Sequence, residues 1–350
     1  MGIPNLRSLC LCLGLMSLGV FGSVDPAGAC STFRIGPKTA PIVGKSYDWH
    51  DGRGLVLSNP RGLQKTALLA DRSAVPVGWT SRYASLTFNQ YGRELPNGGM
   101  NERGLVVEVL WLDNAQFPAP DKRPAISELQ WIQYQLDRFA SVAEMAAAAS
   151  GLRVQPIHAK VHYFACDAGG ECAAFEFLGG RLVVSRGADL PKAVLTNDTY
   201  QSCSQGEARG ALPQSGTGSL ARYARLARAD AAAGGVERAF TLLDGVAVPG
   251  RTQWQIAYDP AKLQVHFRTA ARRDVRFVDL GRVGGDCRQP ARALDLAGPG
   301  KGDVTPQLQP LTATANLALV QHSVAQLGAR LPTGLVQAVA AYPASLRCTF

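Results

Sequence analysis

Long apolar stretches and metal-binding motifs are scarce in this 350-residue chain. The longest apolar run, from Leu9 to Phe21, has 13 residues, whereas a membrane-spanning helix needs about 20. We therefore expect no stable insertion into a membrane. The sequence contains no pair of C-x-x-C units and no H-E-x-x-H motif, and we predict neither a metal nor a cofactor.

Histidine and acidic residues are also few. The chain has 36 Lys and Arg against 27 Asp and Glu, a net charge of +9. The basic residues are scattered and are not interleaved with aromatics, so we expect no nucleic-acid partner. A solvated basic surface that attracts anionic substrates is the simpler interpretation. A histidine-based triad is not favoured, because no serine or cysteine stands at a telling spacing from any of the five histidines: His50, His158, His162, His266 and His322.

The first 29 residues have the pattern of a signal peptide. Arg7 precedes the apolar run, and Asp25 and Pro26 end it, which weakens the alternative of a membrane anchor. Ala27 and Ala29 form an A-x-A site that places the cut directly before Cys30. We therefore expect a periplasmic or secreted protein whose mature chain is a single domain, residues 30–350.

A mature chain that begins with Cys30 carries a thiol and a free α-amine on one residue. An α-amine titrates near ~7.7–8.0 and a thiol near ~8.5, so the amine can act as the base for the thiol at neutral pH. Two alternatives remain open for Cys30: a structural cysteine that happens to follow the cut, or a lipid-modified cysteine. Ala27 weakens the second, because a Leu-like residue normally stands there in lipoproteins.

Six of the eight cysteines remain after the leader is removed. Cys166 and Cys172 flank a five-residue turn between two strand-like runs, and a disulfide across that hairpin is plausible in an exported protein. If Cys30 is a free nucleophile, an odd number is left and at least one more cysteine stays unpaired. The sequence leaves the pairing open among Cys166, Cys172, Cys203, Cys287 and Cys348.

Strand and helix patterns alternate in blocks along the chain. Hydrophobic periodicity and turn residues predict strands within 32–57, 77–88, 98–112, 161–165, 172–178, 181–185, 193–196, 254–258 and 264–268. Helices are predicted near 131–136 and at 145–149, 220–233, 236–243 and 317–327, with Ser127 and Ser141 as N-caps. This order predicts sheets between helical layers around one extended core.

Five short segments carry a family resemblance: CSTF at 30–33, VGKSYDW at 43–49, GMNERGL at 99–105, LTN at 195–197 and SLARY at 219–223. In this order, and with a closing hairpin at 252–269, they resemble the choloylglycine hydrolases and penicillin V acylases, especially exported Gram-negative members. The resemblance ends near residue 269. It implies an α+β, four-layer αββα N-terminal nucleophile hydrolase fold and, because members are often tetramers, a possible homotetramer.

The resemblance also implies roles for individual residues. Cys30 would be the nucleophile and Asp48 would hold its amine, although Asp48 read alone is a turn carboxylate. Asn197 would donate to the oxyanion, together with the backbone N–H of Trp111, although Asn197 read alone is a turn asparagine. Arg222 would stabilise charge near the thiol; otherwise it is one of several arginines on a basic helix face.

Two residues depart from the family pattern. Lys45 stands where the family usually has an arginine beside the nucleophile, and lysine keeps the charge but loses the bidentate fork. Trp111 stands where bile-salt hydrolases tend to have asparagine and penicillin V acylases tyrosine. Its ring would reshape the acyl pocket; the alternative is a core tryptophan in a buried strand.

These observations predict an exported amidase that hydrolyses linear, non-peptide carbon–nitrogen bonds through a thioester on Cys30. We expect a small-molecule acyl amide as substrate, such as penicillin V or an N-acyl homoserine lactone, with conjugated bile salts as the alternative. The competing hypothesis from another class is a non-catalytic exported binding protein or lipoprotein. The tail after about residue 272 lies outside the resemblance, and the sequence assigns it no role.

Overall fold

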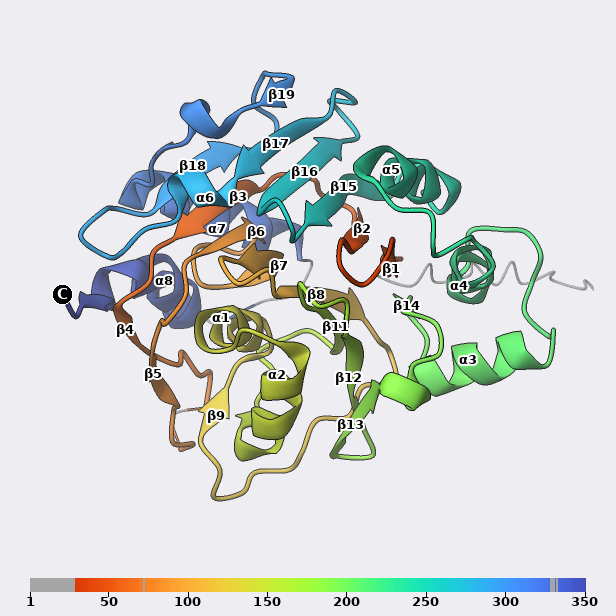
Figure 1. Ribbon diagram of the computed structural model, residues 1–350. Helices are drawn as coiled ribbons and strands as arrows, with labels where there is room; N and C mark the ends of the chain where they lie inside the picture. Colours follow the sequence, from red (N-terminus) through yellow and green to blue (C-terminus); the bar gives the residue numbers. More distant parts are fainter. Residues whose placement is uncertain (1–28, 72, 328–330, 332) are drawn as a thin grey trace, which may run out of the picture.

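Two stacked β-sheets form the centre of the computed structural model, which describes residues 29–71, 73–327, 331 and 333–350 (Figure 1). The seven-stranded sheet has the order β14-β1-β2-β15-β16-β17-β19. Its strands are β1 Ser31–Ile35, β2 Ile42–Asp48, β14 Val194–Leu195, β15 Thr252–Asp259, β16 Gln264–Thr269, β17 Arg276–Asp279 and β19 Gly302–Asp303. All neighbours in it are antiparallel except β17 and β19.

The nine-stranded sheet has the order β13-β12-β11-β8-β7-β6-β3-β18-β20. Its strands are β3 Leu55–Asn59, β6 Ser85–Asn89, β7 Pro96–Asn101, β8 Val106–Trp111, β11 Val161–Cys166, β12 Cys172–Leu178, β13 Arg181–Arg186, β18 Arg292–Asp295 and β20 Gln309–Pro310. Smaller sheets pair β9 Ala125–Ile126 with β10 Arg153–Val154, and join β21 Arg347–Cys348, β4 Leu63–Thr66 and β5 Gly78–Thr80.

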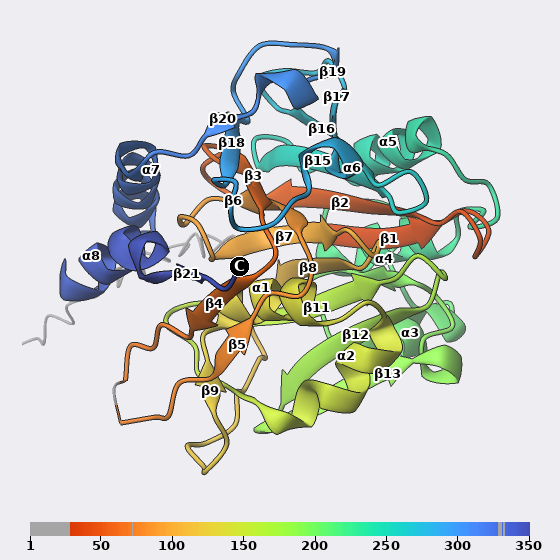
Figure 2. The ribbon, with the colours of Figure 1, turned by 60° about the vertical axis from the view of Figure 1, so that its left-hand side comes forward.

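Helices cover both outer faces of the sheet pair. In Figure 2, α5 lies beyond β2 and β15, and α2 lies on the opposite side, beyond β11 and β12. The α-helices are α1 Glu128–Arg138, α2 Val142–Ala148, α3 Tyr200–Ala208, α4 Ser219–Ala227, α5 Val236–Gly245, α6 Leu280–Val283, α7 Ala313–Gln326 and α8 Thr333–Ala341. Short 3-10 turns occupy Ala149–Gly151, Gly187–Asp189, Thr305–Gln307 and Tyr342–Ser345. The predicted α+β fold with sheets between helical layers is confirmed.

Strand β8 shows how the sequence pattern builds two cores. Val106 and Leu110 pack into the core between the sheets, whereas Val107 and Val109 pack against α1 and α2. Successive strand residues face opposite sides, so a strand covered on both faces must be apolar at almost every position. The near-continuous apolar run of this segment predicted that burial.

Helix boundaries follow the predicted caps only in part. The Ser141 hydroxyl accepts from the Glu144 N–H and caps α2 as predicted, whereas Ser127 precedes α1 without a side-chain cap bond. The helix predicted to run to residue 233 ends at Ala227. There the Asp230 carboxylate accepts from the Ala232 N–H at 2.9 Å, and this local bond competes with the helical ladder.

Two disulfides cross-link the described residues. Cys166–Cys172 spans the β11–β12 hairpin, as expected, and Cys287–Cys348 joins positions 61 residues apart. Cys30 and Cys203 are free and buried, which agrees with the prediction that at least one cysteine besides Cys30 is unpaired. Within the described residues no helix has the length and apolarity that a membrane span needs.

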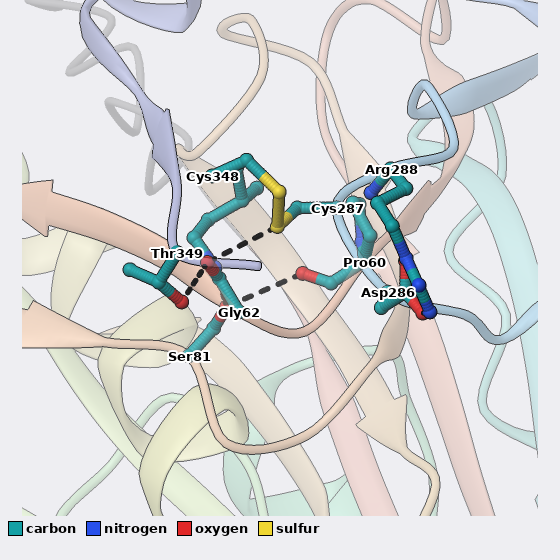
Figure 3. Close-up of a disulfide and its surroundings, with 9 residues drawn as sticks. Pro60, Gly62, Ser81, Asp286, Cys287, Arg288, Cys348 and Thr349 are labelled. Atoms are coloured by element: carbon teal, nitrogen blue, oxygen red, sulfur yellow. Dashed lines mark hydrogen bonds and ion pairs between the residues drawn. A yellow bond between two sulfur atoms is a disulfide. The ribbon is translucent and has the colours of Figure 1, made fainter.

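The second disulfide joins the end of the chain to the segment between α6 and β18, and Gly62 in the loop after β3 lies against the same end (Figure 3). Gly62 accepts from the Thr349 hydroxyl at 2.8 Å and from its N–H at 3.0 Å. Gly62 has φ +83°, and a Cβ there would lie 2.2 Å from the Phe350 ring. The close approach therefore requires glycine at this position, and the C-terminus is held by covalent, polar and packing contacts together.

We expect Cys348→Ser to lower the free energy of unfolding by about 2–4 kcal/mol, because the loop closed by this disulfide is long. Guanidinium unfolding of the oxidised protein measures the change. The double variant C287S/C348S should match the single one, since each removes the same cross-link. An unchanged unfolding midpoint in both variants would contradict this prediction.

Candidate active site

Cys30 lies directly before β1 and beside the end of β2. Ser31 is opposite Ser46 in the β1–β2 register, and the Ala29 N–H donates to the Asp48 carbonyl at 3.4 Å. The Cys30 side chain is 4% exposed, and burial raises the pKa of its thiol. The positive charge of Lys45 is the largest effect that lowers this pKa. Cys30 is thus a buried thiol with charged neighbours, in contrast to an inert cysteine in an apolar core.

Arg222 of α4 connects Cys30 to Asn197. Its Nη1 donates to the Cys30 carbonyl and to the Ser31 hydroxyl, both at 2.6 Å, and its Nη2 donates to the Asn197 Oδ1 at 2.8 Å. Its Nε donates to the Thr217 carbonyl at 2.9 Å. The side chain is 1% exposed, so the alternative of a surface arginine is wrong. The planar guanidinium fork fixes several groups at once, which a lysine could not do.

Asn197 follows β14 and is held on both sides of its side-chain amide. Its Oδ1 accepts from Arg222, and its Nδ2 donates to the Trp111 carbonyl at 2.8 Å. The backbone N–H of Asn197 donates to the Ser219 hydroxyl at 2.9 Å. A primary amide nitrogen carries two hydrogens, so the second one is available to an oxyanion. These tertiary bonds go beyond what a turn asparagine needs.

Asp48, at the end of β2, has one engaged and one unengaged oxygen. Its Oδ1 accepts from the Ser46 and Thr252 hydroxyls at 2.7 and 2.5 Å. Its Oδ2 is buried and has no hydrogen-bond partner among the described residues. Burial raises the pKa of Asp48, and the two hydroxyl bonds oppose that rise. An unpaired buried carboxylate oxygen costs free energy unless a donor reaches it, and the α-amine created by a cut before Cys30 is such a donor.

Lys45 reaches from β2 to the facing sheet. Its ammonium donates to the Val109 carbonyl and lies 3.6 Å from the Glu108 Oε2, and both Lys45 and Glu108 are 1% exposed. The Tyr258 hydroxyl donates to the other Glu108 oxygen. A Cβ at Gly98 would lie 2.3 Å from Glu108, so glycine leaves the room that this carboxylate occupies. Lys45 therefore bridges the two sheets and also acts on the Cys30 thiol through its charge.

Glu108 was not among the predicted site residues. The signal available was one acidic residue within the apolar run GLVVEVLW. Burial raises the pKa of Glu108 to about 7, against the opposing effects of Lys45 and Tyr258. The folded protein thus binds this proton more tightly than the unfolded chain does.

We expect Glu108 to lower stability as pH rises from about 4.5 to about 7. Because the pKa is raised on folding, the folded state binds more protons in this window, and the free energy of unfolding falls with pH. The full effect is about 3 kcal/mol. Unfolding midpoints at pH 5 and pH 8 for the wild type and Glu108→Gln measure it. A difference between the two proteins that does not change with pH would contradict the prediction.

His162 and Glu176 were also missed, and they hold the segment that carries Asn197. The His162 Nε2 lies 2.8 Å from the Thr196 carbonyl, and its Nδ1 lies 3.0 Å from the Glu176 Oε1. Glu176 also accepts from the Tyr200 N–H at 3.1 Å. Both partners of His162 are acceptors, so a hydrogen is needed at each ring nitrogen or on Glu176. Partners 14 and 34 residues away leave no local sequence signal.

A cavity of about 940 Å³, including its open mouth, lies against Cys30. Its walls are almost entirely apolar, and Trp49 and Trp111 line it with ring centroids 5.9 Å apart. The Trp111 indole donates to the Asp113 carboxylate at 2.7 Å and is only partly buried. The alternative of a core tryptophan is therefore wrong; Trp111 is part of the cavity wall.

Two stacked sheets lie between helical layers, and Cys30 at the start of one sheet lies beside a buried carboxylate. This is the arrangement that the predicted N-terminal nucleophile hydrolase fold requires. No family model matches the chain. Penicillin V acylase of Pectobacterium atrosepticum is 26% identical over 336 residues, covering 80% of this chain and 88% of its own length.

Solved structures share the fold. Penicillin V acylase from Agrobacterium tumefaciens superposes with a TM-score of 0.69 at 24% identity, over 81% of this chain and 98% of its own. A variant of the conjugated bile acid hydrolase from Clostridium perfringens gives a TM-score of 0.64 at 16% identity, over 76% and 96%. The chain is therefore similar to penicillin V acylase over most of its length and shares the fold of these structures, in agreement with the resemblance that its motifs carry. The predicted enzyme class, a hydrolase of linear carbon–nitrogen amides, agrees with the activity that the name of the Pectobacterium relative states.

Proposed function

We propose that the mature protein is an exported amidase in which Cys30 attacks linear amides that carry an apolar acyl group. One observation carries this proposal: Cys30 opens on the apolar cavity while it lies next to the unpartnered Asp48 oxygen and the amide of Asn197. A cut before Cys30 would supply the amine that this carboxylate lacks. The leader would then serve both export and the release of the catalytic base.

The proposed reaction proceeds through a thioester. The α-amine of Cys30 takes the thiol proton, and the sulfur attacks the amide carbonyl. The oxyanion accepts from the free N–H of Asn197, with the backbone N–H of Trp111 as the expected second donor. The protonated amine, held by Asp48, returns its proton to the leaving amine. Water then attacks the thioester carbonyl while the α-amine takes its proton, and the carboxylic acid leaves as the Cys30 thiol forms again.

The geometry favours a flat aromatic or linear acyl group over a rigid steroid. The rings of Trp49 and Trp111 line the cavity together with Cys30, and their centroids lie 5.9 Å apart. Penicillin V and N-acyl homoserine lactones fit this description, and conjugated bile salts are the alternative. If the purified protein cleaves glycocholate much faster than penicillin V or an acyl homoserine lactone, the preference for flat or linear acyl groups over steroids is wrong.

Intact-mass measurement of the purified mature protein tests the mechanism. The expected mass is that of an unmodified chain that begins with Cys30. After acid quenching during turnover of an acyl amide, a second species heavier by the acyl group should appear, and peptide mapping should place that group on Cys30. A lipidated N-terminus would support the lipoprotein hypothesis. An acyl adduct on another residue would overturn the assignment of the nucleophile.

A further inference from the structure

The C-terminal helices α7 and α8 supply one wall of the cavity that holds Cys30. Figures 1 and 2 both place these helices on the flank of the sheets away from α3 and α4. Six aliphatic side chains of the two helices and their connection line the cavity: Val324, Leu327, Leu331, Leu335, Val336 and Val339. The tail that lies outside the family resemblance thus takes part in the same site as the nucleophile.

The two ends of the cavity differ in chemistry. Three aromatic side chains line the cavity near Cys30: Tyr47, Trp49 and Trp111. The Trp111 carbonyl accepts a hydrogen bond from Asn197, which places this part of the wall beside the reacting atoms. The hairpin instead packs with Leu95, Leu129 and Tyr91 in a cluster that is aliphatic apart from the Tyr91 ring. An occupant with its carbonyl at Cys30 and an unbranched hydrocarbon tail would match both ends.

The acidic group in this part of the wall is already engaged. The Glu128 carboxylate accepts the backbone N–H groups of Ile157, His158 and Ala159 at 2.8, 3.0 and 3.0 Å. A polar tail placed there would give up hydrogen bonds with water without compensation from this carboxylate. The surroundings of the hairpin therefore favour an apolar occupant.

Polar bonds hold the hairpin against the loop between β6 and β7. The Ser323 hydroxyl donates to the Gln90 carbonyl at 2.5 Å, and the Asn316 Oδ1 accepts from the Arg93 N–H at 2.8 Å. A Cβ at Gly92, which has φ +99°, would lie 2.6 Å from Val320. The Asn316 Nδ2 also donates to the Ala340 carbonyl of α8 at 2.9 Å. These contacts set the position of the wall, and with it the depth of the cavity.

We propose that the α7–α8 hairpin determines acyl-chain length and that the site takes long, unbranched fatty acyl groups whose ends contact Leu335, Val336 and Val339. This inference rests on the proposed function for its reaction, but it concerns a different part of the molecule. Each methylene buried against the hairpin should raise kcat/KM about fourfold until the chain fills the cavity.

The test compares Val336→Trp with Gln337→Trp, which places the same side chain on the exposed face of α8. N-acyl homoserine lactones with acyl chains of four to twelve carbons are the substrates. The ratio of kcat/KM for dodecanoyl to butanoyl substrate should fall at least about tenfold in V336W, because the indole fills the space of the chain end. It should stay within about twofold of wild type in Q337W. An equal loss at every chain length, or no change in either variant, would overturn the proposal.

A binding measurement separates this proposal from the proposed function. Dodecanoate is titrated calorimetrically into Cys30→Ala protein with and without V336W. Weaker binding of dodecanoate in the double variant C30A/V336W supports the hairpin as the site of the acyl-chain end. This holds even if the wild type hydrolyses no acyl amide, in which case only the proposed function fails. Equal binding in both proteins, together with normal hydrolysis, overturns the proposal that the hairpin sets acyl-chain length and leaves the proposed amidase function standing. Should V336W not fold, Val336→Phe replaces it in both experiments.

Discussion

Cys30→Ala is expected to reduce kcat for acyl-amide hydrolysis by at least about 10⁴-fold. The substitution removes the atom that forms the thioester, whereas the α-amine, Asp48 and Arg222 stay in place. Because the alanine side chain is smaller and apolar, the thermal midpoint should change by no more than a few degrees. Steady-state hydrolysis of the best acyl amide, measured with the unfolding curve, gives both values.

Cys203 provides the matched control for this experiment. It is the other free, buried cysteine of the described residues, and burial raises the pKa of its thiol to about 12. Cys203 is not among the residues that line the cavity, whereas Cys30 is, so Cys203→Ala should keep kcat within about twofold. Wild-type activity in C30A, or equal losses in the two variants, would contradict the assignment of Cys30.

A chain that keeps Ala29 offers a second test of the same chemistry. It retains the thiol, but its nitrogen at position 30 is an amide with no basic lone pair. We expect it to be as inactive as C30A toward acyl amides and to become active once Ala29 is removed by an aminopeptidase. Activity in the extended chain would show that the base lies elsewhere.

Asn197→Ala is the second large effect that we expect, a fall in kcat of about 10²–10³-fold with a much smaller change in KM. The loss follows because the oxyanion forms only in the transition state, so a donor aimed at it acts on kcat. Asn197→Asp should be equally inactive, since a carboxylate cannot donate to the oxyanion, although it can still accept from Arg222.

Asn114→Ala is the control for Asn197→Ala. Asn114 is exposed in the turn that follows Trp111, and its removal should leave kcat within about twofold. Unfolding midpoints of both variants distinguish a lost donor from a lost fold. If N197A raises KM by the full factor and leaves kcat unchanged, the side chain binds the ground state and is not an oxyanion donor.

The motifs of this chain predict the residues that would act on the substrate beside the Cys30 thiol. Cys30, Asp48, Asn197 and Arg222 each stand in a short recognisable segment, and the structure links three of them through the Arg222 guanidinium. Such residues can be found in sequence because the reaction requires a particular group at each position. The two sheets were also predictable, since segments such as 106–111 are apolar at almost every position, as a strand covered on both faces must be.

Other features depend on which segments meet in space. Glu108 faces Lys45 only because β8 and β2 lie in opposite sheets, and His162 supports Asn197 only through Thr196 and Glu176. Trp111 fitted a core position as well as a cavity wall on its sequence alone, because alternation in a strand says which residues share a face but not what covers it.

The sequence by itself predicted the α+β fold, because strand and helix patterns depend on residue types at short spacings. It also predicts the catalytic chemistry, and it favoured a Cys166–Cys172 disulfide while it left the cysteine pairing open. Only the tertiary structure decided what surrounds the nucleophile. The tail reaches the cavity because Cys287–Cys348 and the contacts with Gln90 and Arg93 hold it there. Contacts between segments so far apart along the chain leave no periodic or spacing signal, and the shape of the acyl pocket follows from them.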